Sequence, residues 1–309
     1  MSLAIKRFPL SIVIPTKDRE KLLFKSLEFL NRNIFFFNEV IIIDSSAKKL
    51  TKEKLNNFNK NLNIKYYTSK PSTSLQRNLG LRNVRKKNKY VMFLDDDIEF
   101  NKDAFKKMLG FIKNNNNDIA GIGFNLISKF KYGKNLIERI KKSNIFSILG
   151  LYDSRPGIVT SSGWHTKAMN LKKNTQVEWL STQACIYKLE KIKFTNFSNQ
   201  LGDYAYLEDL FFSHQISKKG KLIIYYQAKY KDMLSIERNS FLFGIKEIKN
   251  RILFIEKNKL SKINFILGYF FFITRNFFSS ILNVKKIMRF VGNIIGIFYL
   301  FKIKNFFKT

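Results

Sequence analysis

One stretch of the chain decides the fold: Tyr90-Val91-Met92-Phe93-Leu94-Asp95-Asp96-Asp97-Ile98. Its five apolar residues predict a fully buried strand, and three carboxylates follow at the strand's end. Such acids repel one another unless a cation or strong donors neutralise them. In an open α/β sheet, ligands bind beyond the carboxyl ends of the strands. Because carboxylates suit Mg²⁺ or Mn²⁺, the stretch predicts a metal site for a phosphorylated substrate. The alternative is a solvated acidic turn whose last Asp caps a helix beginning near Asp103.

Short apolar runs alternate with helical patterns on both sides of this stretch. The predicted strands cover residues 10–14, 40–43, 64–67, 90–94 and 119–124, and the predicted helices cover 20–32, a segment opening at Ser72, and about 103–113. In the helix at Ser72 we expect Leu75, Leu79 and Val84 to face the sheet. The alternation predicts a parallel, doubly wound sheet. The strand at 40–43 also ends in an acid, Asp44, as a nucleotide pocket at one sheet edge would require.

The second half of the chain is less regular. Residues 128–175 are basic and poorly periodic, and they predict irregular structure bordering the site, whereas 177–187 and 222–226 predict strands. Between these strands, Glu208 and Asp209 precede a helical pattern. Acids at a helix start either complement the helix dipole or project a general base into a pocket. No GxGxxG and no GxxxxGK[ST] motif is present, so those phosphate-binding loops are excluded.

The charge of the chain predicts an anionic partner. Among 309 residues, 56 Lys+Arg stand against 23 Asp+Glu, a formal net charge of +33. Nucleic acid, acidic lipid and phosphorylated substrates all satisfy this balance. The single cysteine, Cys185, lies in an apolar context and predicts an inert buried thiol. Residues 1–7 lead directly into a strand, so we expect no signal peptide.

The composition changes after residue 240. Residues 241–309 hold thirteen Lys+Arg and two Glu, with apolar runs at 263–273, 277–282 and 291–303. A spanning helix needs about twenty predominantly apolar residues, so these runs predict helices that lie in a membrane surface. The alternative is that they pack as ordinary core. We therefore divide the chain into a catalytic domain, 1–240, and a basic helical region, 241–309.

The order of the motifs resembles family 2 glycosyltransferases, which have a GT-A fold. The matching segments are Ser11–Arg19, Glu39–Ser46, Gln76–Gly80, Phe93–Asp97, and Glu208-Asp209 before Phe211. The resemblance implies an α/β fold with a mostly parallel, mixed sheet flanked by helices, followed here by the C-terminal helical appendage. It also implies an inverting enzyme that moves a sugar from a nucleotide diphosphate to an acceptor hydroxyl.

The resemblance assigns roles by position. It places Pro15, Thr16 and Asp18 in the nucleotide pocket, Asp44 on the base, and Arg77 near the base or diphosphate. In the acidic triplet it implies a ribose contact at Asp95, a donor-site position for Asp96 and the metal ligand at Asp97, the metal being Mn²⁺ or Mg²⁺. Asp209 matches the general base, with Glu208 orienting it or binding the acceptor.

The chain departs from the family pattern at two positions. Ser45 stands where many members have a second acid, which leaves the base identity open. Many members also carry a His after the strand matched by residues 222–226, sometimes as a metal ligand, and this chain has none there. Asp232, near that point, either replaces the His as a metal ligand or is a surface acid. On the acceptor side the candidates are Trp164, His165 and Trp179, although either Trp equally suits a core. His214 is expected to be structural.

The expected partners follow from these assignments. They are a nucleotide-sugar donor, a glycan or lipid-linked acceptor in surface polysaccharide or glycolipid assembly, and an anionic membrane surface, with no nucleic acid. We expect a cytoplasmic protein, peripheral on the inner face of the cell membrane. The competing hypotheses are a basic nucleic-acid-binding protein, a non-catalytic membrane scaffold with the same fold, and a nucleotidyl transferase. The last would leave Glu208 and Asp209 without a role.

Overall fold

The computed structural model describes residues 7–50, 52–115, 118–128, 146–147, 149–203, 205–234 and 238–302. The chain divides into two compact units, each built from two separate segments. Unit 1 comprises residues 1–129 and 168–234, and unit 2 comprises residues 130–167 and 235–309. The single boundary predicted from sequence lies after residue 240 and leaves residues 130–167 in the catalytic domain.

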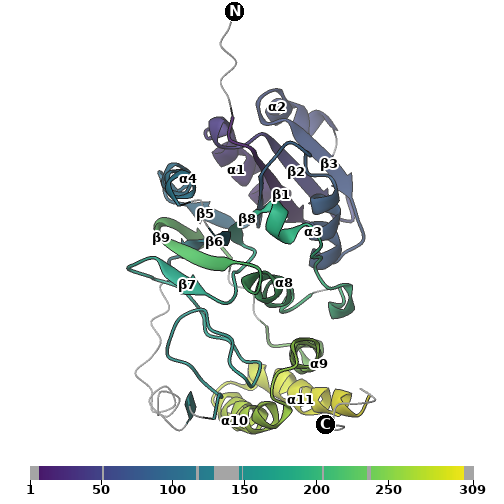
Figure 1. Cartoon of the computed structure of the whole chain (residues 1–309). Helices are drawn as coiled ribbons and strands as arrows, with labels where there is room; N and C mark the ends of the chain where they lie inside the picture. Colours follow the sequence, from purple (N-terminus) through teal and green to yellow (C-terminus); the bar gives the residue numbers. More distant parts are fainter. Residues whose placement is uncertain are drawn as a thin grey trace, which may run out of the picture. The chain divides into compact units, whose positions relative to one another are not determined.

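One mixed sheet runs through the described part of unit 1, in the order β3-β2-β1-β4-β8-β6-β9-β5, with β7 paired to β9 (Figure 1). The strands are β1 Leu10–Thr16, β2 Glu39–Asp44, β3 Ile64–Thr68, β4 Tyr90–Leu94, β5 Ile98–Phe100, β6 Ile119–Leu126, β7 Thr175–Val177, β8 Ala184–Lys188 and β9 Lys221–Asp232. β1 to β4 run parallel, and β8 lies antiparallel between β4 and β6. The fully parallel sheet predicted from the alternation is therefore wrong in its second half, and the mixed sheet implied by the resemblance is confirmed.

Helices cover both faces of the sheet. They are α1 Glu20–Asn31, α2 Lys52–Leu62, α3 Thr73–Arg82, α4 Ala104–Asn114, α7 Leu189–Ile192 and α8 Glu208–Ser217, with 3-10 turns η1 Ile34–Phe36 and η2 Asn199–Leu201. Strand side chains alternate between the faces. In β1, Ile12 and Ile14 join a core under α1, α2 and α4, whereas Val13 joins a core under α3 and α8. At Gly80 of α3 a Cβ would collide with Val13, so a glycine allows this close approach.

Three local expectations differ from the structure. The strand predicted over 177–187 is two strands, because β7 pairs with β9 while β8 pairs with β4 and β6, and residues 178–183 connect the two positions. Leu75 is exposed, since it lies in the first turn of α3, whereas Leu79 and Val84 pack on the core as predicted. The strand predicted at 222–226 continues to Asp232.

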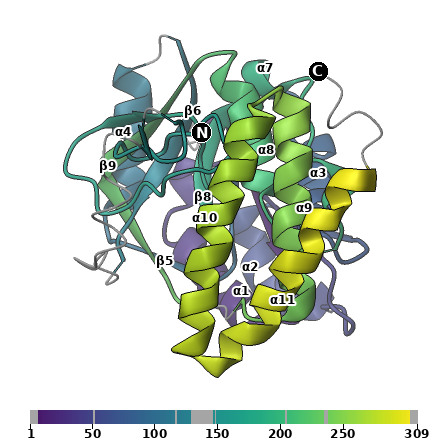
Figure 2. The ribbon, with the colours of Figure 1, turned by 90° about the horizontal axis from the view of Figure 1, so that it is seen from below.

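Unit 2 is helical in its C-terminal segment. Its elements are α9 Phe241–Asn258, α10 Lys262–Ile281, η3 Val284–Lys286, α11 Ile287–Gly296 and η4 Ile297–Lys302 (Figure 2). Side chains of Ile248, Ile252, Phe265 and Tyr269 form its core, and Trp164 packs against it. The apolar runs that the sequence separated at residue 275 belong to one helix, α10. Within the described ranges, no helix combines the length and the apolar character that crossing a membrane requires.

Candidate active site

The carboxyl ends of β1, β2 and β4 bring the predicted acids to one edge of the sheet. Asp95, Asp96 and Asp97 occupy the connection from β4 to β5, and Asp44 closes β2. Asp96 is 2% exposed and Asp97 is 6% exposed. Helix α4 begins later, with Asp103 at its N-cap. The triplet is therefore a buried cluster, and the alternative of a solvated turn capping the next helix is wrong.

Arg19 is the counter-ion of two of these acids. Its Nη1 donates to Asp97 at 2.8 Å and to Asp96 at 3.2 Å. The Thr16 hydroxyl donates to the other oxygen of Asp96 at 2.6 Å, so the Asp96 carboxylate is held by protein groups on both sides. No role for Arg19 was predicted from sequence. Its only local signal is that it is a basic residue in the loop directly after β1.

The cluster carries more negative charge than its arginines balance. Burial is the largest cause that raises the pKa of Asp97 to about 6; the charges of Asp95 and Asp232 act in the same direction, and Arg19 opposes them. Burial likewise raises the pKa of Asp95 to about 6 against the opposing charge of Arg77. A further cation at this edge of the sheet would relieve the repulsion between the carboxylates.

Arg77 connects the acidic triplet to the second acidic motif. Its guanidinium is buried, and Nη2 donates to Asp95 at 2.6 Å while Nη1 donates to Glu208. The Ser74 hydroxyl donates to the other Glu208 oxygen at 3.1 Å. Charge-assisted hydrogen bonds of this kind are the strong ones, and they fix the start of α8 relative to the end of β4. The structure thus brings Arg77, Asp95 and Glu208 together.

Helix α8 begins abruptly at the acidic motif. Leu207, directly before it, has φ 71°, a left-handed conformation that residues other than glycine seldom adopt. Glu208 is buried against Arg77, whereas Asp209 is half-buried and one of its oxygens accepts the backbone N–H of Leu210 at 2.8 Å. The two acids therefore have different surroundings: Glu208 is engaged in an ion pair inside the protein, and Asp209 retains partial access to solvent.

Two predicted nucleotide-pocket acids stabilise the loops around them. The Asp44 carboxylate accepts the Ser46 backbone N–H and the Tyr66 hydroxyl, both at 2.7 Å. Burial alone would raise the pKa of Asp44, but these hydrogen bonds outweigh it and hold the pKa below its ordinary value. Asp18, at φ 54°, accepts the Ala47 backbone N–H at 3.0 Å. Pro15 is buried in β1, where pairing with β4 has already ended.

Asp232 lies beside the acidic triplet at the end of β9. It pairs with Ile98 across β5, and the following N–H, of Met233, donates to the Asp97 carbonyl at 2.9 Å. Gln183 donates to the Asp232 carboxylate at 3.0 Å. Two hypotheses were open for Asp232: a metal ligand or a surface acid. Its position beside Asp97 is compatible with the first, and its exposed side chain is compatible with the second. Gln183 received no role from the sequence, because its contact spans 49 residues.

The acceptor-side candidates have separate surroundings. In unit 2 the Trp164 ring stacks on Phe272 at 4.6 Å between centroids, and the Arg251 guanidinium lies 4.0 Å from the centre of the indole. Burial, with Arg251 nearby, holds the pKa of His165 well below its ordinary value. Trp179 lies partly buried in unit 1, between β7 and β8. Trp164 thus packs in a core, and the acceptor role of all three residues stays a prediction.

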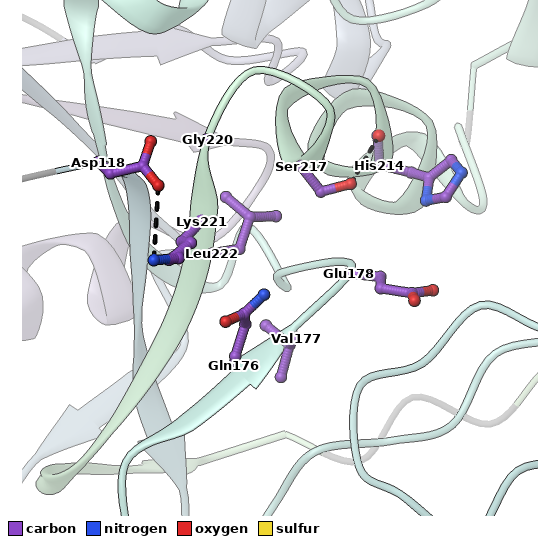
Figure 3. A pocket seen from close by; sticks show the side chains of 9 residues that line it. All are labelled: Asp118, Gln176, Val177, Glu178, His214, Ser217, Gly220, Lys221 and Leu222. Carbon is purple, nitrogen blue, oxygen red and sulfur yellow. Dashed lines mark hydrogen bonds and ion pairs between the residues drawn. The ribbon is translucent and has the colours of Figure 1, made fainter.

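The remaining singled-out side chains have structural environments. Cys185 is fully buried in β8, which confirms the predicted burial, and burial raises the pKa of its thiol. His214 and Glu178 line a hollow of about 440 Å³, with Asp118 and Lys221 paired at 3.5 Å across one side (Figure 3). This hollow lies where β6 and β9 begin, the opposite edge from the acidic triplet. It is therefore separate from the candidate active site.

The fold is that of the GT-A glycosyltransferases. A mannosyltransferase from Pyrobaculum calidifontis, solved with GDP-Man and Mn²⁺, matches at TM-score 0.55 and 11% identity, covering 96% of this chain and 88% of that one. Residues 1–349 of S. aureus TarS match at TM-score 0.53 and 16% identity, over 85% of this chain and 72% of that one. The predicted GT-A fold is confirmed.

The family model described as glycosyl transferase family 2 matches residues 11–177, more than half of the sequence, and the chain belongs to that family. The family membership that the resemblance implied is thereby confirmed. A curated relative, chondroitin synthase from Escherichia coli, is 41% identical over 93 residues, which are 29% of this chain and 13% of that protein. The chain therefore matches only a small part of the length of that relative. A longer TarS structure is likewise covered over 39% of its length.

Proposed function

We propose that this glycosyltransferase moves a sugar from a nucleotide diphosphate to an acceptor hydroxyl, with inversion and with Mg²⁺ or Mn²⁺. The observation that carries the proposal is the buried carboxylate cluster at the sheet edge, which Arg77 ties to the acidic start of α8. This arrangement would supply a region for metal and phosphate and a separate proton acceptor. A non-catalytic scaffold would have no need for buried like charges, which destabilise a fold.

The residues present fit a metal held jointly with the donor. No group of three or more His, Cys, Asp or Glu side chains in the described ranges forms a metal site by itself. Mg²⁺ commonly uses one or two carboxylates plus substrate phosphates, so such a cage is not required. Asp97, with Asp232 beside it, would be the protein ligands, and the raised pKa of Asp97 is consistent with a place for positive charge. The metal would neutralise the departing diphosphate.

The rest of the donor site follows from the contacts. Asp95 would hold the ribose, with Arg77 fixing its carboxylate in place. Pro15, Asp18 and Asp44 would line the base region; each oxygen of Asp44 keeps a further lone pair for a base N–H beyond its two protein hydrogen bonds. The hydrogen bond between Thr16 and Asp96 would hold this part of the donor site in place.

Chemistry requires a base on the acceptor side. In a single displacement the acceptor oxygen bonds to the anomeric carbon, the bond from that carbon to the diphosphate breaks, and the hydroxyl proton passes to a carboxylate. We assign this role to Asp209, because Glu208 is occupied by Arg77 and Ser74. Glu208 then acts as a positioning residue.

The acceptor is proposed as a saccharide, free or lipid-linked, in surface polysaccharide or glycolipid assembly. The similarity to a protein named chondroitin synthase supports a saccharide acceptor. Trp164, His165 and Trp179 remain candidates for contacts to it. We further propose that the protein is peripheral on the inner face of the cell membrane.

The test is nucleotide binding with and without Mn²⁺, measured by calorimetry for UDP, GDP, TDP and CDP. We expect one nucleotide to bind, and Asp97→Ala to weaken its metal-dependent binding at least about tenfold, since a charged ligand is lost. Asp209→Asn should keep nucleotide binding while donor turnover falls about 10²- to 10⁴-fold, the usual contribution of a general base.

Asp103→Ala is the matched control. Asp103 is exposed, lies six positions after Asp97, and makes no side-chain cap to α4. Binding and turnover should match the wild type. Absence of nucleotide binding by the wild type at any metal concentration would remove the basis of the proposal, and so would unchanged metal dependence in Asp97→Ala.

A further inference from the structure

Helix α11 of unit 2 presents its large apolar residues outward. Its buried positions are Gly292, Asn293 and Gly296. The exposed positions from α11 into η4 are instead large and apolar: Ile287, Met288, Val291, Ile294, Ile295, Phe298 and Phe301. A surface helix of a water-soluble domain has the opposite arrangement, with the apolar stripe facing the core. The pattern indicates that the outer face of α11 contacts something apolar.

The inward face of α11 explains why the large residues point outward. α11 packs on α9 so closely that a Cβ at Gly292 would collide with the Phe241 carbonyl, and one at Gly244 with the Arg289 carbonyl. Asn293 donates to the Gly244 carbonyl and to Glu247, each at 3.0 Å. Helices in contact with lipid pack against one another in this way, through small residues, close backbone contact and hydrogen bonds, because burying apolar side chains between them gains nothing.

Helix α10 continues the apolar face. Its exposed large apolar residues lie on the side of the helix away from buried Phe265, Tyr269 and Phe272, with one exposed polar residue, Thr274, among them. They are Ile263, Leu267, Phe270, Phe271, Phe277, Phe278 and Ile281. α10 and α11 contact each other and join at η3, as Figure 2 shows. In this turn Leu282 is 88% exposed and Val284 is 74% exposed. We call the outward residues of α10, η3 and α11 the α10–α11 surface.

Charge identifies the occupant of this surface. From Lys257 to the end of the sequence there is no Asp or Glu, whereas Lys285 and Lys286 lie in the turn beside Leu282 and Val284. A second copy of the chain would bring like charges together across a symmetric interface. An anionic lipid surface suits both the apolar side chains and the lysines. The apolar side chains would lie at the boundary of the acyl chains, and the lysines would lie at the head groups.

We propose that the α10–α11 surface docks onto an anionic lipid membrane, with α10 and α11 lying along its plane. This inference rests on the packing and charge of unit 2 and is independent of the proposed sugar transfer. The expectation from sequence was membrane attachment of residues 241–309 in general. The α10–α11 surface narrows it to one face, with exposed apolar side chains and neighbouring lysines.

The test is cosedimentation of the full-length protein with vesicles of phosphatidylcholine, alone or mixed with phosphatidylglycerol. We expect binding to the mixed vesicles that weakens as salt rises. The double variant Leu282→Glu/Met288→Glu should lose about a hundredfold in partitioning, about tenfold for each large side chain no longer buried. The double variant Lys285→Gln/Lys286→Gln should lose about thirtyfold in partitioning.

Matched controls lie in unit 1. Phe194 is 85% exposed, so Phe194→Glu tests an equally exposed aromatic outside the α10–α11 surface. Lys86→Gln/Lys87→Gln removes two adjacent exposed lysines from the same unit. Both controls should bind like the wild type, and circular dichroism should show that every variant is folded.

Two outcomes would overturn the proposal. One is equal affinity for neutral and anionic vesicles in all variants. The other is absence of vesicle binding together with a concentration-dependent dimer, seen by analytical ultracentrifugation, that Leu282→Glu/Met288→Glu dissociates. That second result would assign the α10–α11 surface to another copy of the chain.

Discussion

Two arginines each serve two carboxylates at the candidate active site. Arg19 contacts Asp96 and Asp97, and Arg77 contacts Asp95 and Glu208. Removing either arginine would leave buried acids without their partner, which typically costs about 3–5 kcal/mol in a buried pair. Arg19 is partly exposed, whereas Arg77 is buried and belongs to the interior of the framework.

Asp97→Asn should stabilise the metal-free protein at neutral pH. The folded-state pKa of Asp97, about 6, exceeds its ordinary 3.8, so the folded protein holds an extra proton between these values. Wild-type stability therefore falls as pH rises through that range, and the charged carboxylate costs at most about 3 kcal/mol above it. The asparagine variant avoids this cost.

Chemical denaturation with a metal chelator, from pH 4 to pH 8, measures this effect. The stability advantage of Asp97→Asn should appear as pH rises from about 4 to about 6 and then stay constant. Asp103→Asn, at an exposed position outside the acidic cluster, is the comparison. A lower stability of Asp97→Asn at pH 7.5 would show that the Arg19 pair outweighs the repulsion.

The acids of the candidate site could be predicted from sequence, but their partners could not. The spacing of Asp95–Asp97 after an apolar strand located the cluster. Thr16 contacts Asp96 across 80 positions, and Arg77 contacts Glu208 across 131 positions. Such contacts depend on which strands become neighbours. Local pattern carries no information on that point, so Arg19, Tyr66 and Gln183 received no roles.

Among the secondary-structure elements, the strands before β5 were predictable because each is a short apolar run bounded by loops. The insertion of β8 between β4 and β6 was not, because an antiparallel strand with both faces buried has the same apolar pattern as a parallel one. Likewise nothing local to residues 178–183 showed that the chain leaves β7 beside β9 and enters β8 beside β4.

Two helix glycines should respond in opposite directions to the same substitution. Gly80→Ala in α3 places a methyl group against Val13 of β1 and should destabilise the protein by about 1–3 kcal/mol, the usual cost of overpacking. At Gly110 in α4 a Cβ would meet no atom within 4 Å. Gly110→Ala should therefore stabilise the protein by about 0.5–1 kcal/mol.

Urea denaturation of the two alanine variants and the wild type checks this prediction. The pair controls for the common loss of glycine flexibility in the unfolded chain, so the difference between the variants reports the fit of α3 on β1. Equal shifts in the same direction would mean that α3 does not approach β1 as closely as described.

On the scale of the whole molecule, each unit is made of two chain segments. Trp164, from the first segment of unit 2, packs on Arg251 and Phe272 from the second. A protein ending at residue 240, the boundary expected from sequence, would lack both partners. We expect this truncation to expose Trp164 to water.

Fluorescence can follow this change because the chain has two tryptophans. With Trp179→Phe, emission from Trp164 should shift to longer wavelength on truncation after residue 240. With Trp164→Phe, emission from Trp179 in unit 1 should stay unchanged. An unshifted Trp164 emission in the truncated protein would show that residues 146–167 need no contact with the later segment.

The interleaved segments also set an order of events during synthesis. All residues of unit 1 have been made once the ribosome passes residue 234, whereas Trp164 must wait for α9 and α10, which begin at Phe241 and Lys262. At roughly 5–20 residues per second, the whole of α9 to α11 takes several more seconds to emerge. During that interval Trp164 lacks Arg251 and Phe272, its contacts in α9 and α10, and we expect it to stay available to chaperones until α10 has left the exit tunnel.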